Sequence, residues 1–198
     1  MPPAREKKVA LIPHEPVDHA LGRSRGGFGT KLHLVTDGRG LPLAVVLSPG
    51  QAHESQFVAP ALDAVHIARV GPGRPRQRPD AVAGDKGYSY RTIRRWLTQH
   101  HVRAVIPTRS NQRSQSAFDA AAYRQRHVIE CTVGLLKEAR RIATRYEKLA
   151  VHFLGVLKLG MLQMHLALSL SNTPWPSPTL SARSDSVSIG RSQRLELS

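Results

Sequence analysis

Short apolar or alternating runs between residues 31 and 106 predict four β-strands. Polar and apolar residues alternate over 31–36, an apolar run follows at 43–47, and the turn sequence Asp-Gly-Arg-Gly at 37–40 joins them. This arrangement predicts a hairpin. Two further apolar runs, at 81–83 and 102–106, are each followed by a Gly or a Pro and are typical of short strands.

Four other segments carry apolar residues at helical spacing: 55–68, 90–100, 118–141 and 149–170. Together with the strands they predict an α/β fold. The segment 149–170 is long and apolar enough to suggest a membrane span. Lys158 would lie near the centre of that span at a cost of about 2.5–3.5 kcal/mol, so we expect a buried core helix and no membrane partner.

The two ends of the chain lack a periodic apolar pattern. Residues 1–22 contain four prolines and predict an irregular lead-in, with too short an apolar run for a signal peptide. Residues 171–198 are rich in Ser, Thr and Pro and predict a disordered tail. One domain is therefore expected over residues 23–170 of the 198.

The charge balance predicts a polyanionic partner. Lys and Arg number 29 against 14 Asp and Glu, which gives a formal net charge of +15. Nucleic acid is the simplest such partner, although passive binders and enzymes share this balance. Cys131 is the single cysteine, so an intramolecular disulfide and a cysteine-based zinc site are both excluded, which fits a reducing cytoplasm.

A polar stripe within the segment 118–141 is the first candidate site. Tyr123, Arg126, Glu130 and Lys137 follow one another at steps of three, four and seven residues. On a helix these four positions fall within a stripe of roughly 60°. A carboxylate flanked by cations suits a metal ion held beside a phosphate. A solvated charged face has the same spacing, so this stretch alone leaves both interpretations open.

A second acid, Asp85, directly follows the strand at 81–83. Open α/β sheets place their sites just beyond the carboxyl ends of strands. Gly84 and Gly87 permit a tight turn around the carboxylate, and Lys86 adds a cation beside it. An ordinary turn has the same composition.

Two polar segments closer to the N-terminus are also candidates. The basic, glycine-rich sequence at 22–27 lets the backbone approach a phosphate closely, with Arg23 and Arg25 supplying charge. A flexible basic loop is the alternative. His53 and Glu54 are candidate ligands, but a polar turn that caps the following helix is the simpler interpretation.

Several of these motifs, in this order, resemble insertion-sequence transposases of the DDE class, of the IS4/IS5 type. The resemblance rests on GRSRGG at 22–27, PGQAHES at 49–55, GDKGY at 84–88, IP followed by basic residues at 106–113, and Y-x2-R-x3-E-x6-K at 123–137. It covers about residues 15–165. It implies a ribonuclease H-like mixed sheet flanked by helices.

The resemblance also implies an activity and a cofactor. The family cleaves transposon ends and transfers the strand to target DNA, with two Mg2+ ions held by three carboxylates and with Mn2+ as an alternative metal. By resemblance, Asp85 is the second acid and Glu130 the third. Tyr123, Arg126 and Lys137 match DNA-facing positions, and we expect Lys86, Arg23, Arg25 and Arg109 to contact double-stranded DNA as well.

One part of the family pattern is absent. The first acid and its strand, which is central in the sheet between the hairpin and the strand leading to Asp85, have no match here. Asp18 matches a later segment, and residues 9–12 are only a candidate for the vacant strand.

We therefore expect a catalytic domain that is truncated at its N-terminus and inactive alone. Its missing acid would come from an upstream-frame product or another transposase subunit. We expect a bacterial cytoplasmic, nucleoid-associated protein, with the carboxylates of Asp85 and Glu130 within about 8 Å of each other. The alternative is a non-catalytic, basic DNA-binding remnant or modulator of a full-length transposase.

Overall fold

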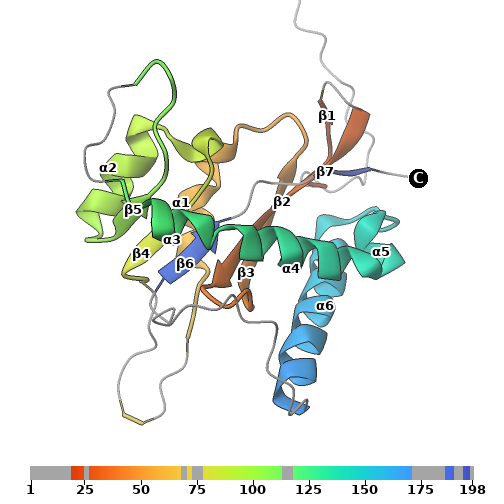
Figure 1. The fold of residues 1–198 in the computed structure, drawn as a ribbon. Helices are drawn as coiled ribbons and strands as arrows, with labels where there is room; N and C mark the ends of the chain where they lie inside the picture. The colour runs from red at the N-terminus through yellow and green to blue at the C-terminus, as the bar shows by residue number, and fades with distance from the viewer. Residues whose placement is uncertain are drawn as a thin grey trace, which may run out of the picture.

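A seven-stranded mixed sheet with helices on both faces organises the chain in the computed structural model (Figure 1). The structure describes residues 19–24, 27–67, 71–72, 78–112, 118–170, 186–189 and 194–196. This architecture confirms the predicted α/β fold class, a mixed sheet flanked by helices, and is consistent with the ribonuclease H-like arrangement that the resemblance implies.

The long strand β2 is the element around which the sheet is built. It is antiparallel to all four of its neighbours, with β1 and β3 along one edge and β6 and β7 along the other. Beyond β6 the strands β4 and β5 continue the sheet in parallel orientation. The strands are β1 (Gly22–Ser24), β2 (Gly27–Asp37), β3 (Pro42–Pro49), β4 (Ala81–Ala83), β5 (Arg103–Val105), β6 (Ser186–Ile189) and β7 (Arg194–Glu196).

The helices divide between the two faces because side chains alternate along the strands. Val35 and Val82 pack with α1 and α2, whereas Leu32 and Leu34 pack with α4, α5 and α6 on the other face. Figure 1 shows α3 and α4 following one another across the strands. The helices are η1 (Glu54–Gln56), α1 (Val58–Asp63), η2 (Lys86–Tyr88), α2 (Arg91–Gln99), α3 (Ala120–Arg124), α4 (His127–Glu138), α5 (Arg140–Ala143) and α6 (Ala150–Leu170).

The predicted hairpin forms, and its turn also anchors a helix. The Asp37 carboxylate accepts hydrogen bonds from the backbone N–H groups of Arg39 and Leu41, and Gly40 has a φ of 93°, which favours glycine. The Gly40 carbonyl accepts a 2.7 Å hydrogen bond from the Thr132 hydroxyl of α4. The turn therefore fixes the position of α4 against the sheet.

The segment expected as one helix over 118–141 is three helices. Gln125 and Arg126 separate α3 from α4 by a turn that keeps right-handed helical backbone angles. Ala139 has ψ at 110°, which ends α4 and starts α5. The apolar period continues across both breaks, so periodicity alone did not reveal them.

A fully buried arginine ties the loop before α6 to the start of β2. Arg145 donates to the carbonyls of Glu147 and His19, both at 2.8 Å, and to the Thr30 hydroxyl. Its guanidinium also lies 5.2 Å from the centroid of the Phe153 ring. Since each buried donor here has an acceptor, the charge is tolerated and fixes this corner of the fold.

The expectation of a buried core helix is right for only one face of α6. Phe153, Leu157 and Met161 are buried, but Val151 and Leu159 are 67% and 68% exposed. Only 17% of the window Ala150–Ala167 is buried, and that window is long and apolar enough to count as a candidate membrane span. A helix that is apolar on every side does not reveal from its sequence which side will be covered.

Two short strands form within the segment predicted as a disordered tail, and one of them fills the central position of the missing first strand. Residues 186–189 and 194–196, expected to be disordered, form β6 and β7 along β2. β6 occupies the central position between β2 and β4, with Val187 and Ile189 buried among the core side chains. The short Ser-Val-Ser-Ile alternation was hidden by the Ser-rich composition around it. Residues 9–12 lie outside the described residues.

We predict that His33 makes stability depend on pH. Burial, and secondarily the Lys31 cation, lower the pKa of His33 from 6.5 to about 4. Between these pH values the unfolded chain binds a proton that the folded chain does not, so stability falls as pH falls. At pH 4.5 the loss from this residue is about 2–3 kcal/mol.

Urea unfolding of wild type and His33→Gln at pH 7 and pH 4.5 measures this loss. Gln retains a polar group for the Ser48 hydroxyl, which lies 2.8 Å from His33 Nε2, but does not titrate. The variant should therefore lose less stability on acidification. An equal loss in both proteins would contradict the assignment.

Candidate active site

Polar side chains gather where the parallel strands end. The segment after β4 carries Asp85 and η2, and the segment after β5 carries Arg109. The antiparallel strand β3 ends at the same side, since Pro49 pairs with Thr30 near the start of β2, and leads into η1. η1 and η2 contact each other. We call this side the carboxyl end of the sheet.

Two carboxylates converge at Gly87. A Cβ atom added to Gly87 would lie 2.7 Å from Asp85 Oδ1 and 3.4 Å from Glu54 Oε2, so these two oxygens are at most about 6 Å apart. Asp85 Oδ1 is buried, and Lys31 Nζ lies 3.7 Å from Glu54 Oε1. A side chain at position 87 would force the Asp85 carboxylate to shift. The result is a compact acidic pair with a cation beside it.

Arg109 supports the turn that carries Asp85. Its Nε donates to the Lys86 carbonyl at 3.1 Å and its Nη2 to the Gly87 carbonyl at 2.9 Å. The guanidinium lies 4.1 Å from the centroid of the Tyr90 ring. Arg109 was predicted to contact DNA. In the folded protein, three contacts hold it at the carboxyl end, where it fixes the shape of η2.

His53 acts as the cap that the simpler interpretation expected. Its Nδ1 accepts a 3.3 Å hydrogen bond from the backbone N–H of Ser55 at the start of η1. Its ring also packs edge-on against Tyr90, with the ring centroids 4.7 Å apart. His53 therefore positions η1, and with it Glu54, against the Asp85 turn.

Three residues of the predicted polar stripe contact one another. Arg126 Nη2 lies 2.8 Å from Glu130 Oε1, and the Arg126 guanidinium lies 5.6 Å from the centroid of the Tyr123 ring. The side chain of Arg126 is 19% exposed and that of Glu130 is 56% exposed. Tyr123 in turn packs against Ala81 and other residues of β4 and β5. The stripe thus holds an accessible carboxylate against a shielded cation.

The packing of α4 indicates the direction in which Glu130 points. Val128 and Thr132 contact the turn at Gly40, which lies at the opposite end of the strands from the carboxyl end. At 100° per residue, Glu130 points about 160° away from Thr132 around the helix axis. Glu130 therefore points away from the side of α4 that contacts this turn, which agrees with its 56% exposure. Its separation from Asp85 stays a prediction.

The remaining predicted site residues have different surroundings. Lys86 and Arg23 are exposed, and Lys137 is half-buried in the last turn of α4. Arg25 lies outside the described residues. Across the part of the chain that the structure describes, no three His, Cys, Asp or Glu side chains form a group that could hold a metal ion.

Sequence reasoning undervalued Glu54, Lys31 and Tyr90. Glu54 was not chosen as a ligand because a turn that caps the following helix accounted for its position. Lys31 and Tyr90 were assigned to a predicted strand and a predicted helix and were given no role in a site. One signal was available for Glu54, because like Asp85 it lies shortly after the end of a predicted strand.

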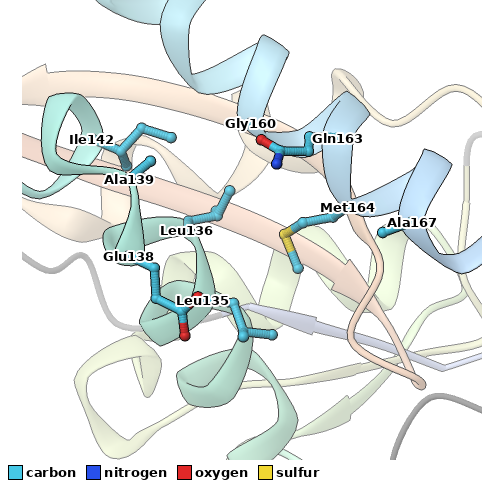
Figure 2. A pocket seen from close by; sticks show the side chains of 9 residues that line it. All are labelled: Leu135, Leu136, Glu138, Ala139, Ile142, Gly160, Gln163, Met164 and Ala167. Atoms are coloured by element: carbon cyan, nitrogen blue, oxygen red, sulfur yellow. The ribbon is translucent and has the colours of Figure 1, made fainter.

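A separate apolar pocket of about 430 Å³ lies between α4, α5 and α6 (Figure 2). Leu136, Ile142 and Met164 contribute to its lining, and Glu138 is the one carboxylate among the lining residues. This pocket lacks the paired charges of the carboxyl end. The carboxyl end is therefore the better candidate for chemistry on a charged substrate.

Comparison with known proteins confirms the resemblance. A family model described as "Transposase DDE domain" matches residues 12–162. A protein described as the transposase for insertion sequence element IS402 of Burkholderia cepacia is 35% identical over 132 residues, or 67% of this chain. A protein described as the transposase for insertion sequence element IS6501 of Brucella ovis is 31% identical over 132 residues, or 66% of this chain.

The two relatives differ in how much of their own length is matched. The chain spans 60% of the IS402 protein and 93% of the IS6501 protein. No solved structure matches the chain significantly.

We predict that Gly87→Ala destabilises the protein by about 1–3 kcal/mol, because the new methyl group meets Asp85 Oδ1. Adding Asp85→Ala should recover part of the loss, since the clashing atom is then gone. Gly155→Ala is the matched control, because a Cβ there has open space and Ala favours the helix by about 1 kcal/mol. Urea unfolding measures all three, and a Gly87→Ala protein as stable as wild type would refute the described packing.

Proposed function

Because the chain belongs to the DDE transposase family, we propose that it is the catalytic part of a DNA transposase in which Asp85 and Glu130 hold Mg2+ beside a DNA phosphodiester. The family generally uses divalent metal ions and acts on DNA. The observation that carries the proposal is the gathering of acids and cations at the carboxyl end of the sheet. The reaction proposed is cleavage of transposon ends followed by strand transfer to target DNA.

The donor chemistry suits the metal. Carboxylate oxygens are the ligands that Mg2+ prefers, and the buried Asp85 Oδ1 and the exposed Glu130 carboxylate are of this kind. A pair of such ions would stabilise the charge that develops on the attacking and leaving oxygens of a phosphodiester. Mn2+ has the same ligand preference and is the alternative metal.

The surrounding residues have supporting roles in this proposal. Arg126 pairs with Glu130 at 2.8 Å and also lies 5.6 Å from the centroid of the Tyr123 ring, so it would help to orient the Glu130 carboxylate. Arg109 keeps the Asp85 turn in shape through two backbone carbonyls. Lys86 and Arg23, which are exposed, would contact the phosphate backbone and set the register of the DNA, as would Arg25 and Lys137.

The acid set is incomplete in this proposal. Glu54 lies beside Asp85, but its ion pair with Lys31 makes it a positioning group for the Asp85 turn. We assign the missing acid to an upstream-frame product or to another transposase subunit, and the chain alone would then be inactive. Its working setting is the bacterial cytoplasm, at the nucleoid.

A second candidate function is non-catalytic DNA binding, as a remnant or modulator of a full-length transposase. Two observations favour it. The chain carries a net charge of +15, and within the described ranges no metal-binding group of three acidic, histidine or cysteine side chains forms. In this case the protein would bind DNA with steep salt dependence and would have no use for Glu130.

Substitution of Glu130 separates the two functions. In a protein with the upstream segment restored, Glu130→Gln should lower Mg2+-dependent nicking of terminal-repeat DNA by about 100-fold or more, because the amide loses the charge that holds the metal. Glu138→Gln, an exposed acid on the same helix, is the control and should leave nicking unchanged. Wild-type nicking in Glu130→Gln would exclude the catalytic proposal.

The position of the DNA can be tested through salt dependence. Lys86→Ala should weaken binding to duplex DNA and lower the slope of log K against log salt by about 1, because one phosphate contact is lost. Arg39→Ala is the control, since Arg39 is also exposed but lies at the hairpin turn, where it pairs with Asp37 at 3.6 Å. Equal slopes for the two variants would argue against DNA at the carboxyl end.

A further inference from the structure

Among the described residues, the C-terminal strands cover the edge of β2 that faces β4. β6 pairs with residues 35–37 of β2, and β7 pairs with residues 29–31. Within the part of the chain that the structure describes, β6 alone connects β2 to β4 in the sheet, through parallel pairing with residues 81–83. The continuity of the sheet therefore depends on a four-residue strand from the far end of the chain.

This strand lies outside the part of the chain shared with the family. The family match ends at residue 162, whereas β6 is formed by residues 186–189. Without β6, the shared part would have β2 and β4 with an open strand position between them. Unpaired N–H and C=O groups would then line both sides of that position, which is the arrangement that accepts an added strand.

The C-terminal segment fits this position imperfectly. Three residues of β2 (32–34) separate its pairing with β6 from its pairing with β7, whereas four residues (190–193) separate β6 from β7, so the two ladders are offset by one residue. The Thr36 hydroxyl is buried, and among the described residues no group hydrogen-bonds to it. Its direct partner across the ladder is Ser188.

We infer that the position between β2 and β4 is an acceptor site for an extended strand of a second polypeptide, and that residues 186–189 of this chain occupy it in its place. The second strand would run antiparallel to β2 and parallel to β4. It would carry apolar side chains at the registers of Val187 and Ile189 and a hydrogen-bond acceptor at the register of Ser188, opposite Thr36. This assembly does not depend on the metal chemistry proposed above.

A reversible disulfide tests whether β6 of the same chain controls the access of another strand to the position between β2 and β4. Val35→Cys and Ile189→Cys, which are direct antiparallel partners, are introduced together with Cys131→Ser. Oxidation should give a monomer with β6 locked in place. Disulfide-linked dimers instead of monomers would show that the strand comes from another copy, and would overturn the statement that each chain fills the position with its own strand.

The probe is a fluorescein-labelled peptide of residues 184–197 with Gly190 omitted, which removes the offset, and with Ser188→Asn, whose amide oxygen can accept from Thr36. The reduced protein should bind it at least tenfold more tightly than the oxidised protein, measured by fluorescence anisotropy. The same peptide with Val187→Pro, which loses a ladder donor, should not bind. Equal binding to both protein forms, or no binding to the reduced form, would overturn the inference.

Discussion

The backbone hydrogen bonds of β2 are the constraint on which the rest of the structure depends. This strand has eleven residues and pairs on both edges, so every other part of the sheet is placed relative to it. Its alternating side chains also separate the two layers of helices, because Val35 faces α1 and α2 while Leu34 faces α4 and α6. A buried arginine, Arg145, fixes the start of the same strand through Thr30. The pairing of the strands, the division of the helices between two layers and the position of the loop before α6 therefore all depend on β2.

Most of the charged side chains at the carboxyl end have a partner of their own. Lys31 lies against Glu54 at this end, and on α4 Arg126 lies against Glu130. Arg109 gives two donors to backbone carbonyls of the Asp85 turn, so its charge shapes that turn. The backbone that carries Asp85 is therefore held by a charged side chain through two hydrogen bonds. A rigid set of acids is what a metal-dependent reaction on a phosphodiester would require.

The C-terminal segment and α6 both carry apolar side chains, but these side chains are buried to different extents. β6 buries Val187 and Ile189 because a sheet position beside β2 is available to it. α6 has more apolar residues than any other helix, yet Leu159 and other large side chains on its outer face stay exposed. Apolar content alone did not decide which segment was covered. The decisive factor was whether a neighbouring element offered a complementary surface.

The sequence by itself determined the local elements and the family. The hairpin, the strand that leads to Asp85 and the helical spacing of Arg126 and Glu130 follow from periodicity and turn residues, which act over a few positions. The tertiary structure decided that β6 fills the centre of the sheet, that Glu54 lies beside Asp85, and that one face of α6 is open. These features join residues far apart in the chain. Pairing and burial at such distances depend on competition among all available surfaces, and no local pattern encodes the outcome.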